Sequence, residues 1–309
     1  MDLEIVRPDE KAKYNDFCVK LVTPFVSLPP EVIWHYTNGA SLISILKTGT
    51  LYSTQISCLN DSREFRHVRD LFAEAVKAQN PGVNDNAKYL IDLLNSGLQR
   101  DTVHFDAWFI TCFSSKRDDL SQWRAYGNGE NGYAIGLISS WLRECGKAHG
   151  SLLIPVCYDL QKTRNFVADL AQATIRFFLQ GIDDRPGVDR EKWARSFLKE
   201  WGEQIEHFQP LFKDPAFKDE SEWRLIHRLT ATETSAMEYV QKPSMLSRHL
   251  PLRFPPPGKP DARLLPIQEV MIGPGRHKEV SRISVGDLLR TCGYQSVEVT
   301  VSSVPYQSA

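Results

Sequence analysis

Apolar residues recur along the chain in two patterns, one typical of helices and one typical of strands. Spacings of three and four residues predict helices over residues 8–23, 161–212 and 285–292, and with breaks over 60–100. Short runs of β-branched and aromatic residues predict strands at 32–36, 51–54, 107–114, 133–137, 152–158, 223–229, 267–272 and 297–304. These elements neither alternate strictly nor separate into blocks. The expected fold class is therefore α+β with a mixed sheet.

Local signals refine this picture of the chain. Asn38–Ser41 reads as a turn into a helix, and Gly49 is suited to end that helix because glycine tolerates left-handed backbone. Trp193, Phe197 and Trp201 recur every four residues, which predicts a buried aromatic stripe. We expect a single domain, residues 1–309, with an N-terminal helix at about 8–23 and a helical insertion at about 161–212.

The composition is that of an ordinary globular protein and limits the classes of function. The chain has 309 residues, of which 42% are hydrophobic, and a net charge of −1. A protein that holds nucleic acid mainly through phosphates needs an excess of Lys and Arg, which this chain lacks. The six cysteines include no Cys-x-x-Cys pair, and their spacing predicts no metal site.

The N-terminal residues and the hydropathy of the chain predict its cellular location. Residues 1–14 are charged and contain no apolar core of a signal peptide. No apolar run approaches the ~20 residues that span a bilayer. We expect a cytoplasmic protein with no membrane partner.

One apparent nucleotide-binding motif is better explained as a turn. Gly127–Gly132 has the letters of the Gly-x-Gly-x-x-Gly dinucleotide fingerprint. However, it precedes a predicted strand instead of joining a strand to a helix, so a phosphate there would meet no helix N-terminus.

Two segments rich in aromatic residues carry side chains suited to binding. Trp34–Thr37 places His35 near the end of a predicted strand, where a lone His most often has a structural role. Cys112–Ser114 is followed by Trp123 and Tyr126, three residues apart on one helical face beside a polar loop. That spacing suits a wall on which a planar ligand stacks.

The segment Glu220–Arg224 is the strongest acidic candidate. Glu220 and Glu222 are two residues apart at the start of a predicted strand, so their side chains are expected to point the same way. Their repulsion is relieved by solvent, by a nearby positive charge or by a cationic transition state. The segment is therefore either a solvated strand end or a site that uses a carboxylate.

Together these segments resemble a large bacterial family described only as a domain of unknown function. Its members carry a His-Tyr pair, an Asn-Asp-x-x-Glu loop, a Trp-x-x-Tyr stretch that ends in Gly, a Glu-x-Glu-Trp-Arg strand and a Ser-x-x-Pro-Tyr tail. The matching residues are His35-Tyr36, Asn60–Glu64, Trp123–Gly132, Glu220–Arg224 and Ser302–Tyr306. The order of these parts is also similar to that of the ADP-ribosyltransferase superfamily. That resemblance implies a mixed sheet of ADP-ribosyltransferase-like type with helical insertions, and NAD as substrate.

The same resemblance implies roles for individual residues. His35 would hydrogen-bond the adenosine-side ribose of NAD, and Tyr126 or Trp123 would stack on the nicotinamide ring. Glu222 would bind the 2′-hydroxyl of the other ribose and stabilise an oxocarbenium-like transition state, while Glu220 would orient an acceptor. The remaining residues expected to bind NAD are Tyr36, Thr37, Asn60, Ser114 and Arg224. Tyr36 stands where the superfamily usually has Gly, whose backbone approaches the nicotinamide closely.

The resemblance implies NAD-dependent ADP-ribosyl transfer or NAD hydrolysis, with protein, nucleic acid or water as the acceptor. A bacterial toxin or phage-defence effector, with a partner protein that neutralises it, would be a fitting context. Two alternatives stay open. One is a Mg²⁺-dependent nuclease that uses Asp61, Glu64, Glu220 and Glu222. The other is a non-catalytic sensor that binds a nucleotide in the same cleft.

Overall fold

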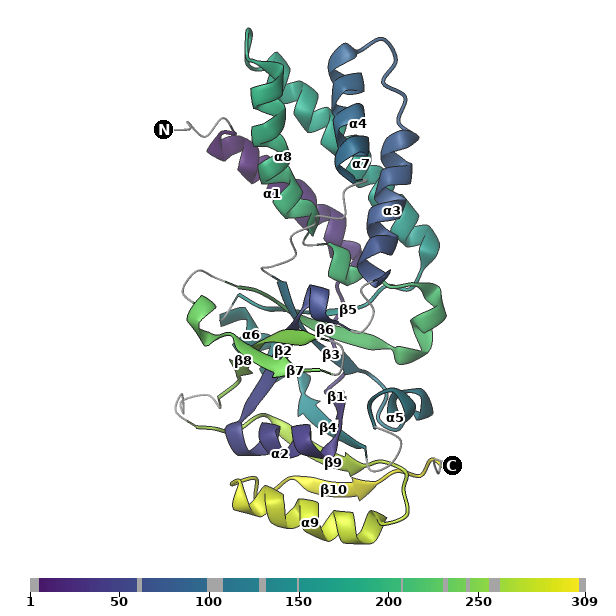
Figure 1. Ribbon diagram of the computed structural model, residues 1–309, viewed down its shortest axis with the longest axis vertical. Coiled ribbons are helices and arrows are strands. Elements are labelled where there is room, and N and C mark those ends of the chain that lie inside the picture. Colours follow the sequence, from purple (N-terminus) through teal and green to yellow (C-terminus); the bar gives the residue numbers. More distant parts are fainter. Residues whose placement is uncertain are drawn as a thin grey trace. The chain divides into compact units, whose positions relative to one another are not determined.

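The chain divides into two units, one helical and one built on a sheet (Figure 1). A computed structural model describes residues 6–59, 63–98, 108–127, 132–148, 150–206, 208–229, 233–242, 245–255 and 262–305. The helical unit comprises Met1–Val26, Asp61–Phe105 and Cys157–Ala216, and the sheet unit comprises Ser27–Asn60, Asp106–Val156 and Phe217–Ala309. The N-terminal helix and the helical insertion, expected as separate additions to one domain, therefore belong to the same unit.

The helical unit is built around aromatic side chains. Its helices are α1 (Pro8–Val22), α3 (Arg63–Lys77), α4 (Asp85–Leu98), α7 (Leu160–Asp183) and α8 (Arg190–Glu206), with short 3-10 turns η1 (Thr23–Phe25) and η3 (Gln209–Leu211). Helix α7 packs against α3, α4 and α8, and α8 also packs against α1. Trp193, Phe197 and Trp201 of α8 are fully buried, which confirms the predicted stripe.

The buried indole groups of α8 make specific contacts with α7. Trp193 Nε1 donates to the carbonyl oxygen of Phe178 at 3.0 Å, and Trp201 Nε1 donates to Thr174 Oγ1 at 2.7 Å. Gly181 lets the two helices approach, because a Cβ atom there would lie 2.0 Å from the Trp193 ring. Aromatic packing and satisfied N–H donors together hold these two helices in register.

The sheet unit contains one mixed sheet. Its strands are β1 (Val32–Thr37), β2 (Thr50–Gln55), β3 (Trp108–Ser114), β4 (Tyr133–Ile138), β5 (Leu152–Pro155), β6 (Glu222–Arg228), β7 (Glu238–Gln241), β8 (Leu246–Arg253), β9 (Ile267–Ile272) and β10 (Glu298–Val301). The main order is β10-β9-β4-β1-β3-β2-β8-β7, and β6 pairs with both β3 and β5. Only β9 and β10 pair in parallel among the described strands. The expectation of a mixed α and β fold with a mixed sheet is confirmed.

Helices cover the two faces of the sheet unequally. The helices are α2 (Gly39–Thr48), α5 (Leu120–Tyr126), α6 (Ser139–Ala148) and α9 (Lys278–Thr291), and the unit also has the 3-10 turns η2 (Ile56–Cys58) and η5 (Thr234–Ala236). The 3-10 turn η4 (Pro215–Glu220) begins in the helical unit and ends in the sheet unit. Helices α2, α6 and α9 contribute Leu42, Leu142 and Leu289 to the larger core. On the opposite face, α5 contributes Trp123 to a smaller cluster. We call these the main face and the α5 face.

Helix α2 follows the predicted start and stop signals. The side chain of Asn38 accepts a hydrogen bond from Ser41 N at 2.9 Å, which caps the first turn. Gly49 ends the helix in left-handed backbone with φ of 62°. A Cβ atom at Gly49 would also lie 2.4 Å from the Arg263 backbone, so glycine is required there on two counts.

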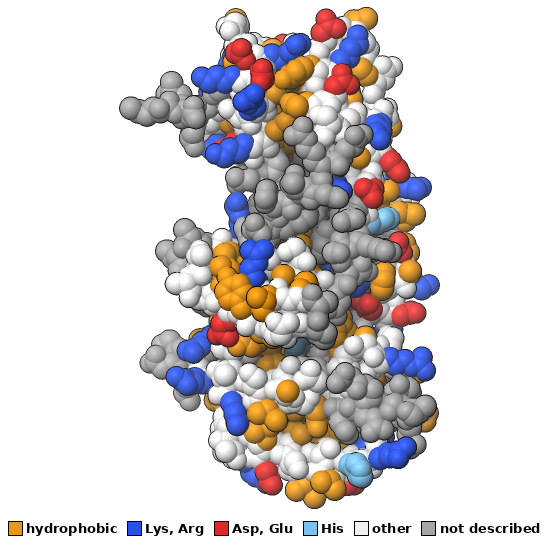
Figure 2. All heavy atoms as spheres, in the orientation of Figure 1, with side chains coloured by type: hydrophobic (Ala, Val, Ile, Leu, Met, Phe, Trp, Pro, Cys, Tyr) orange, Lys and Arg blue, Asp and Glu red, His pale blue; other side chains and the backbone are white. Residues whose placement is uncertain are grey.

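Charged side chains are mixed over the part of the surface that Figure 2 shows. Lys and Arg lie among Asp and Glu on the face drawn, in keeping with the near-zero net charge. Among the described residues, no helix combines the length and the apolar content needed to cross a bilayer.

Candidate functional site

The sheet opens beside strand β3. Strand β6 pairs with β3 along its whole length, from Trp108 to Ser114, and so occupies one edge of β3. On the other edge β2 pairs with Phe109 and Ile110, while β1 pairs with Ser114 alone. Strands β1 and β2 therefore separate alongside Thr111–Phe113. We call this gap the β3 fork.

His35 bridges the β3 fork from strand β1. Its Nδ1 lies 3.0 Å from the carbonyl oxygen of Cys112, and its ring contacts that of Phe113 at 5.8 Å. Burial lowers the pKa of His35, although the hydrogen bond to Cys112 opposes this shift. Because a carbonyl oxygen only accepts, the neutral imidazole carries its proton on Nδ1.

The pleat of the sheet separates His35 from Glu222. Trp34 pairs with Ser114, and Ser114 pairs with Glu222, so these three side chains lie on the α5 face. His35 is next to Trp34 in the strand and therefore lies on the main face, with Phe113. The structure thus brings Glu222 together with Ser114 but not with His35.

Glu222 and Arg224 form a buried ion pair on the α5 face of β6. Arg224 Nε donates to Glu222 Oε1 at 2.8 Å, and Arg224 Nη2 donates to Glu222 Oε2 at 3.0 Å. The side chains are 1% and 6% exposed for Arg224 and Glu222. A two-point contact of this kind fixes the orientation of the carboxylate. Arg224 thus supplies a positive charge beside Glu222, one of the two acidic residues of the segment.

Glu220 is not part of the strand that carries Glu222. It ends the 3-10 turn η4, and Ser221 between them has left-handed backbone with φ of 46°. The alternation of side chains along β6 therefore does not extend to Glu220. For this reason the strand geometry does not support the expectation that the Glu220 and Glu222 carboxylates point the same way. The Glu220 carbonyl accepts a hydrogen bond from Ser114 Oγ at 2.7 Å. The Ser114 hydroxyl thus holds the turn that leads into β6.

Tyr36 and Trp123 pack together on the α5 face. Their ring centroids lie 4.7 Å apart in an edge-to-face arrangement, and both side chains are buried. The Tyr36 hydroxyl donates to the Lys116 carbonyl at 2.9 Å, and burial raises the pKa of Tyr36. Tyr126, one turn beyond Trp123, is 39% exposed. Of the two aromatic residues expected to stack on a ligand, Tyr126 is therefore partly exposed, whereas Trp123 is buried against Tyr36.

Asp118 ties α5 to the C-terminal segment, a connection that the sequence analysis missed. Trp123 Nε1 and Ser302 Oγ both donate to Asp118 Oδ1, at 2.7 and 2.6 Å, and Ser303 N donates to Oδ2 at 2.9 Å. Burial raises the pKa of Asp118, but these hydrogen bonds outweigh it and hold the pKa below its usual value. Asp118 therefore stays ionised and anchors the first two residues of the Ser-x-x-Pro-Tyr motif.

The structure says less about the remaining candidate residues. Thr37 is buried at the end of β1, opposite Tyr133. Asn60 and Asp61 lie outside the described residues, as does the side chain of Glu64. Within the described part of the chain, no group of three or more His, Cys, Asp or Glu side chains is arranged to hold a metal ion.

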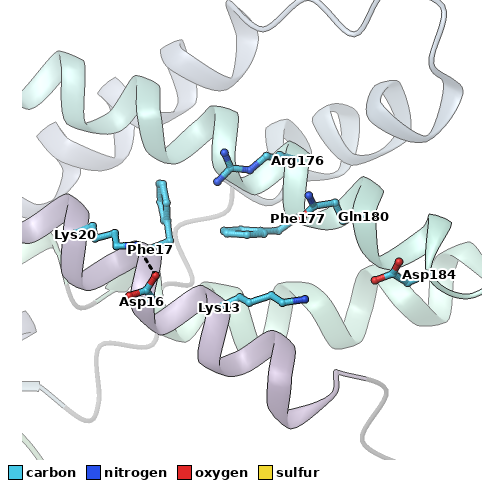
Figure 3. Close-up of a pocket in the computed structure, with 8 residues that line it drawn as sticks. All are labelled: Lys13, Asp16, Phe17, Lys20, Arg176, Phe177, Gln180 and Asp184. Carbon is cyan, nitrogen blue, oxygen red and sulfur yellow. Dashed lines mark hydrogen bonds and ion pairs between the residues drawn. The ribbon is translucent and has the colours of Figure 1, made fainter.

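Each unit also contains a surface cavity. In the sheet unit, a cavity of about 460 Å³ lies against β2, β7 and β8, where Tyr52 donates to Glu238 Oε2 at 2.6 Å. In the helical unit, a cavity of about 610 Å³ lies between α1 and α7 (Figure 3). Neither cavity is lined by Glu222, His35 or Tyr126.

Comparison with known proteins gives one family match. The model of a family described as "Protein of unknown function (DUF2971)" matches residues 122–225, which run from α5 into β6. The match includes Trp123, Tyr126, Glu222 and Arg224, and it supports the expectation of an uncharacterised domain family. No curated protein and no solved structure gives a significant match.

Proposed function

We propose that the sheet unit cleaves the bond between nicotinamide and ribose in NAD, with Glu222 as the carboxylate that faces the sugar. The observation that supports this most directly is the fixed orientation of Glu222, both of whose oxygens accept hydrogen bonds from Arg224. A charged group that is oriented before the substrate binds stabilises developing charge without reorganising. Arg224 acts here as a positioning residue.

The proposed step builds positive charge on the ribose. The C–N bond breaks, and its electron pair leaves with the ring nitrogen of nicotinamide, which becomes neutral. The oxygen of water or of an acceptor hydroxyl then bonds to the sugar carbon and loses its proton to solvent; an acceptor nitrogen would react in the same way. A carboxylate beside this carbon stabilises the transition state more than the ground state.

The binding surface that we propose is the α5 face alone. Tyr126 stacks on the nicotinamide, and Trp123 with Tyr36 forms the support behind it. In this proposal Ser114, the strand partner of Glu222, contacts the same ribose. We assign His35 no contact with NAD, since it lies on the main face.

A second candidate is a protein that binds a nucleotide and does not cleave it. The specific observation in its favour is the charge of Arg224, which neutralises the Glu222 carboxylate at hydrogen-bond distance. A neutralised carboxylate contributes less to a cationic transition state than a free one does. Both candidates use the same surface, so one experiment separates them.

The experiment is to incubate the full chain with NAD and to quantify released nicotinamide by chromatography, with NAD binding measured in parallel by calorimetry. We expect release by the wild type and a loss of about 10²- to 10³-fold in Glu222→Gln, a change that keeps an amide oxygen for Arg224. Glu220→Gln is the matched control and should retain NAD hydrolysis. NAD binding without release, unchanged in Glu222→Gln, would favour the second candidate. Absence of both binding and release would exclude both.

A further inference from the structure

The cavity of the helical unit is lined by one face of α1 and one face of α7 (Figure 3). Lys13, Phe17 and Lys20 recur at spacings of four and three residues on α1, so they lie on the same side of that helix. Arg176, Phe177 and Gln180 face them from α7. The lining therefore combines cations, two aromatic rings and one amide.

The charges in this cavity are not balanced. Asp16 pairs with Lys20 at 2.7 Å, and Asp184 pairs with Arg7 at 3.2 Å, so both carboxylates of the lining are already engaged. In the part of the chain that the structure describes, Lys13 has only a long contact with Asp9, at 3.8 Å. Within the described residues, no carboxylate forms an ion pair with Arg176. Lys13 and Arg176 therefore have positive charge that an anionic ligand could neutralise.

Arg176 is held in place by aromatic rings. The centre of its guanidinium lies 4.9 Å from the ring centroid of Phe177 and 5.6 Å from that of Phe17. The two rings are 5.7 Å apart and nearly perpendicular. Cation–π contacts of this kind orient a guanidinium without using its N–H donors, which remain free to bind an anion.

We propose that this cavity binds a mononucleotide. The phosphate would contact Arg176 and Lys13, and the base would lie against the Arg176–Phe17–Phe177 group, with the Gln180 amide able to donate to and accept from the base edge. The volume of about 610 Å³ is that of a small-molecule site. A nucleotide satisfies the two cations and the aromatic surface at once, whereas inorganic phosphate or a nucleoside satisfies only one of them.

The test uses the full chain and AMP as the probe, with adenosine and inorganic phosphate as partial ligands, each titrated by calorimetry. We expect AMP to bind at least about tenfold more tightly than either fragment. Arg176→Ala and Lys13→Ala should each weaken AMP binding by about tenfold or more, and Arg176→Lys by less. Lys88→Ala in α4, which removes a cation of the same unit that pairs with Asp85 and does not line the cavity, is the matched control and should change affinity by less than about threefold.

Two outcomes would overturn the proposal: no AMP binding, or AMP binding that Arg176→Ala and Lys13→Ala leave unchanged. Phosphate binding as tight as AMP would also overturn it, because the aromatic residues would then have no role. The site is independent of NAD cleavage. Glu222→Gln should keep AMP binding at this cavity, and Arg176→Ala should keep any release of nicotinamide.

Discussion

His35 donates its Nδ1 proton to the Cys112 carbonyl, 3.0 Å away, across the β3 fork. The bond joins β1 to β3 one residue beyond their single strand pair, Trp34 with Ser114. It therefore holds β1 against β3 where the two strands have few backbone hydrogen bonds. This placement predicts a structural role for His35.

Replacing His35 by Ala should lower the free energy of unfolding by about 1–3 kcal/mol, because a buried hydrogen bond is lost. His35→Asn, whose amide donates from nearly the position of Nδ1, should lose less. Urea denaturation of the three proteins measures the difference. Nicotinamide release per folded molecule should be equal in all three. Loss of release at unchanged stability would instead support the ribose contact that the family resemblance implies.

The ion pair of Glu222 and Arg224 gives a prediction about stability. Arg224→Met removes the guanidinium that pairs with the buried Glu222 carboxylate, and we expect a loss of about 3–5 kcal/mol in the free energy of unfolding. The double variant Glu222→Leu with Arg224→Met removes both charges and should recover a large part of that loss. Denaturant titration of the single and double variants tests this. If the single and double variants were equally unstable, the buried charge of Glu222 would not be the cause of the loss.

Gly181 and Gly202 form a matched pair in the helical unit. A Cβ atom at Gly181 meets the buried Trp193 ring at 2.0 Å, whereas one at Gly202 in α8 meets nothing within 4 Å. Gly181→Ala should therefore destabilise the protein by about 3 kcal/mol or more. Gly202→Ala should stabilise it by about 0.5–1 kcal/mol through helix propensity. Thermal unfolding monitored by circular dichroism measures both shifts, and shifts of the same sign would contradict the packing described.

His249 predicts how stability depends on pH. Burial, aided by nearby Lys242 and opposed by Glu238, lowers its pKa to about 4 in the folded protein, against about 6.5 in an unfolded chain. Between these values the unfolded chain binds more protons, so stability increases with pH and is lost as the pH falls. The full effect is about 3 kcal/mol, of which about 2 kcal/mol falls between pH 6.5 and pH 5.

The measurement is urea denaturation at pH 7 and pH 5 for the wild type and for His249→Gln. Burial also lowers the pKa of His35, which adds a dependence of the same sign. The contribution of His249 is therefore the part that His249→Gln removes. Parallel curves for the two proteins would rule it out.

Prediction from sequence succeeded where local pattern and final environment agree. Strand β9 has the predicted bounds because four of the six residues of Ile267–Ile272 are apolar and all four are buried, together with Glu269. Strand β8 was missed, since it contains Pro251 and three basic side chains, which argue against a strand. Pro251 has no N–H to donate to a neighbouring strand. The structure accommodates it because the pairing of β8 with β7 ends at His249, two residues earlier. Strand β7 is exposed throughout and carries no apolar alternation.

Much of the candidate site depends on contacts that no local pattern contains. The sequence identified Glu222, Arg224, Trp123 and Tyr126 because their spacing along one strand or one helix is informative. It did not identify Asp118 as an anchor for Ser302, because the two residues are 184 positions apart. It also could not place His35 and Glu222 on opposite faces, since that relation depends on the strand register at Ser114.

Strand pairing has a practical consequence for anyone who expresses part of this protein. The family match stops at residue 225, inside β6, and leaves out β3, the neighbour of β6, together with β1 and β9, which flank β4. A polypeptide cut at those limits would carry bare strand edges beside exposed apolar faces, a combination that invites aggregation. A fragment for crystallisation or spectroscopy should instead begin before Pro8, so that α8 keeps its contact with α1, and extend past Ser303, so that every strand keeps its neighbours.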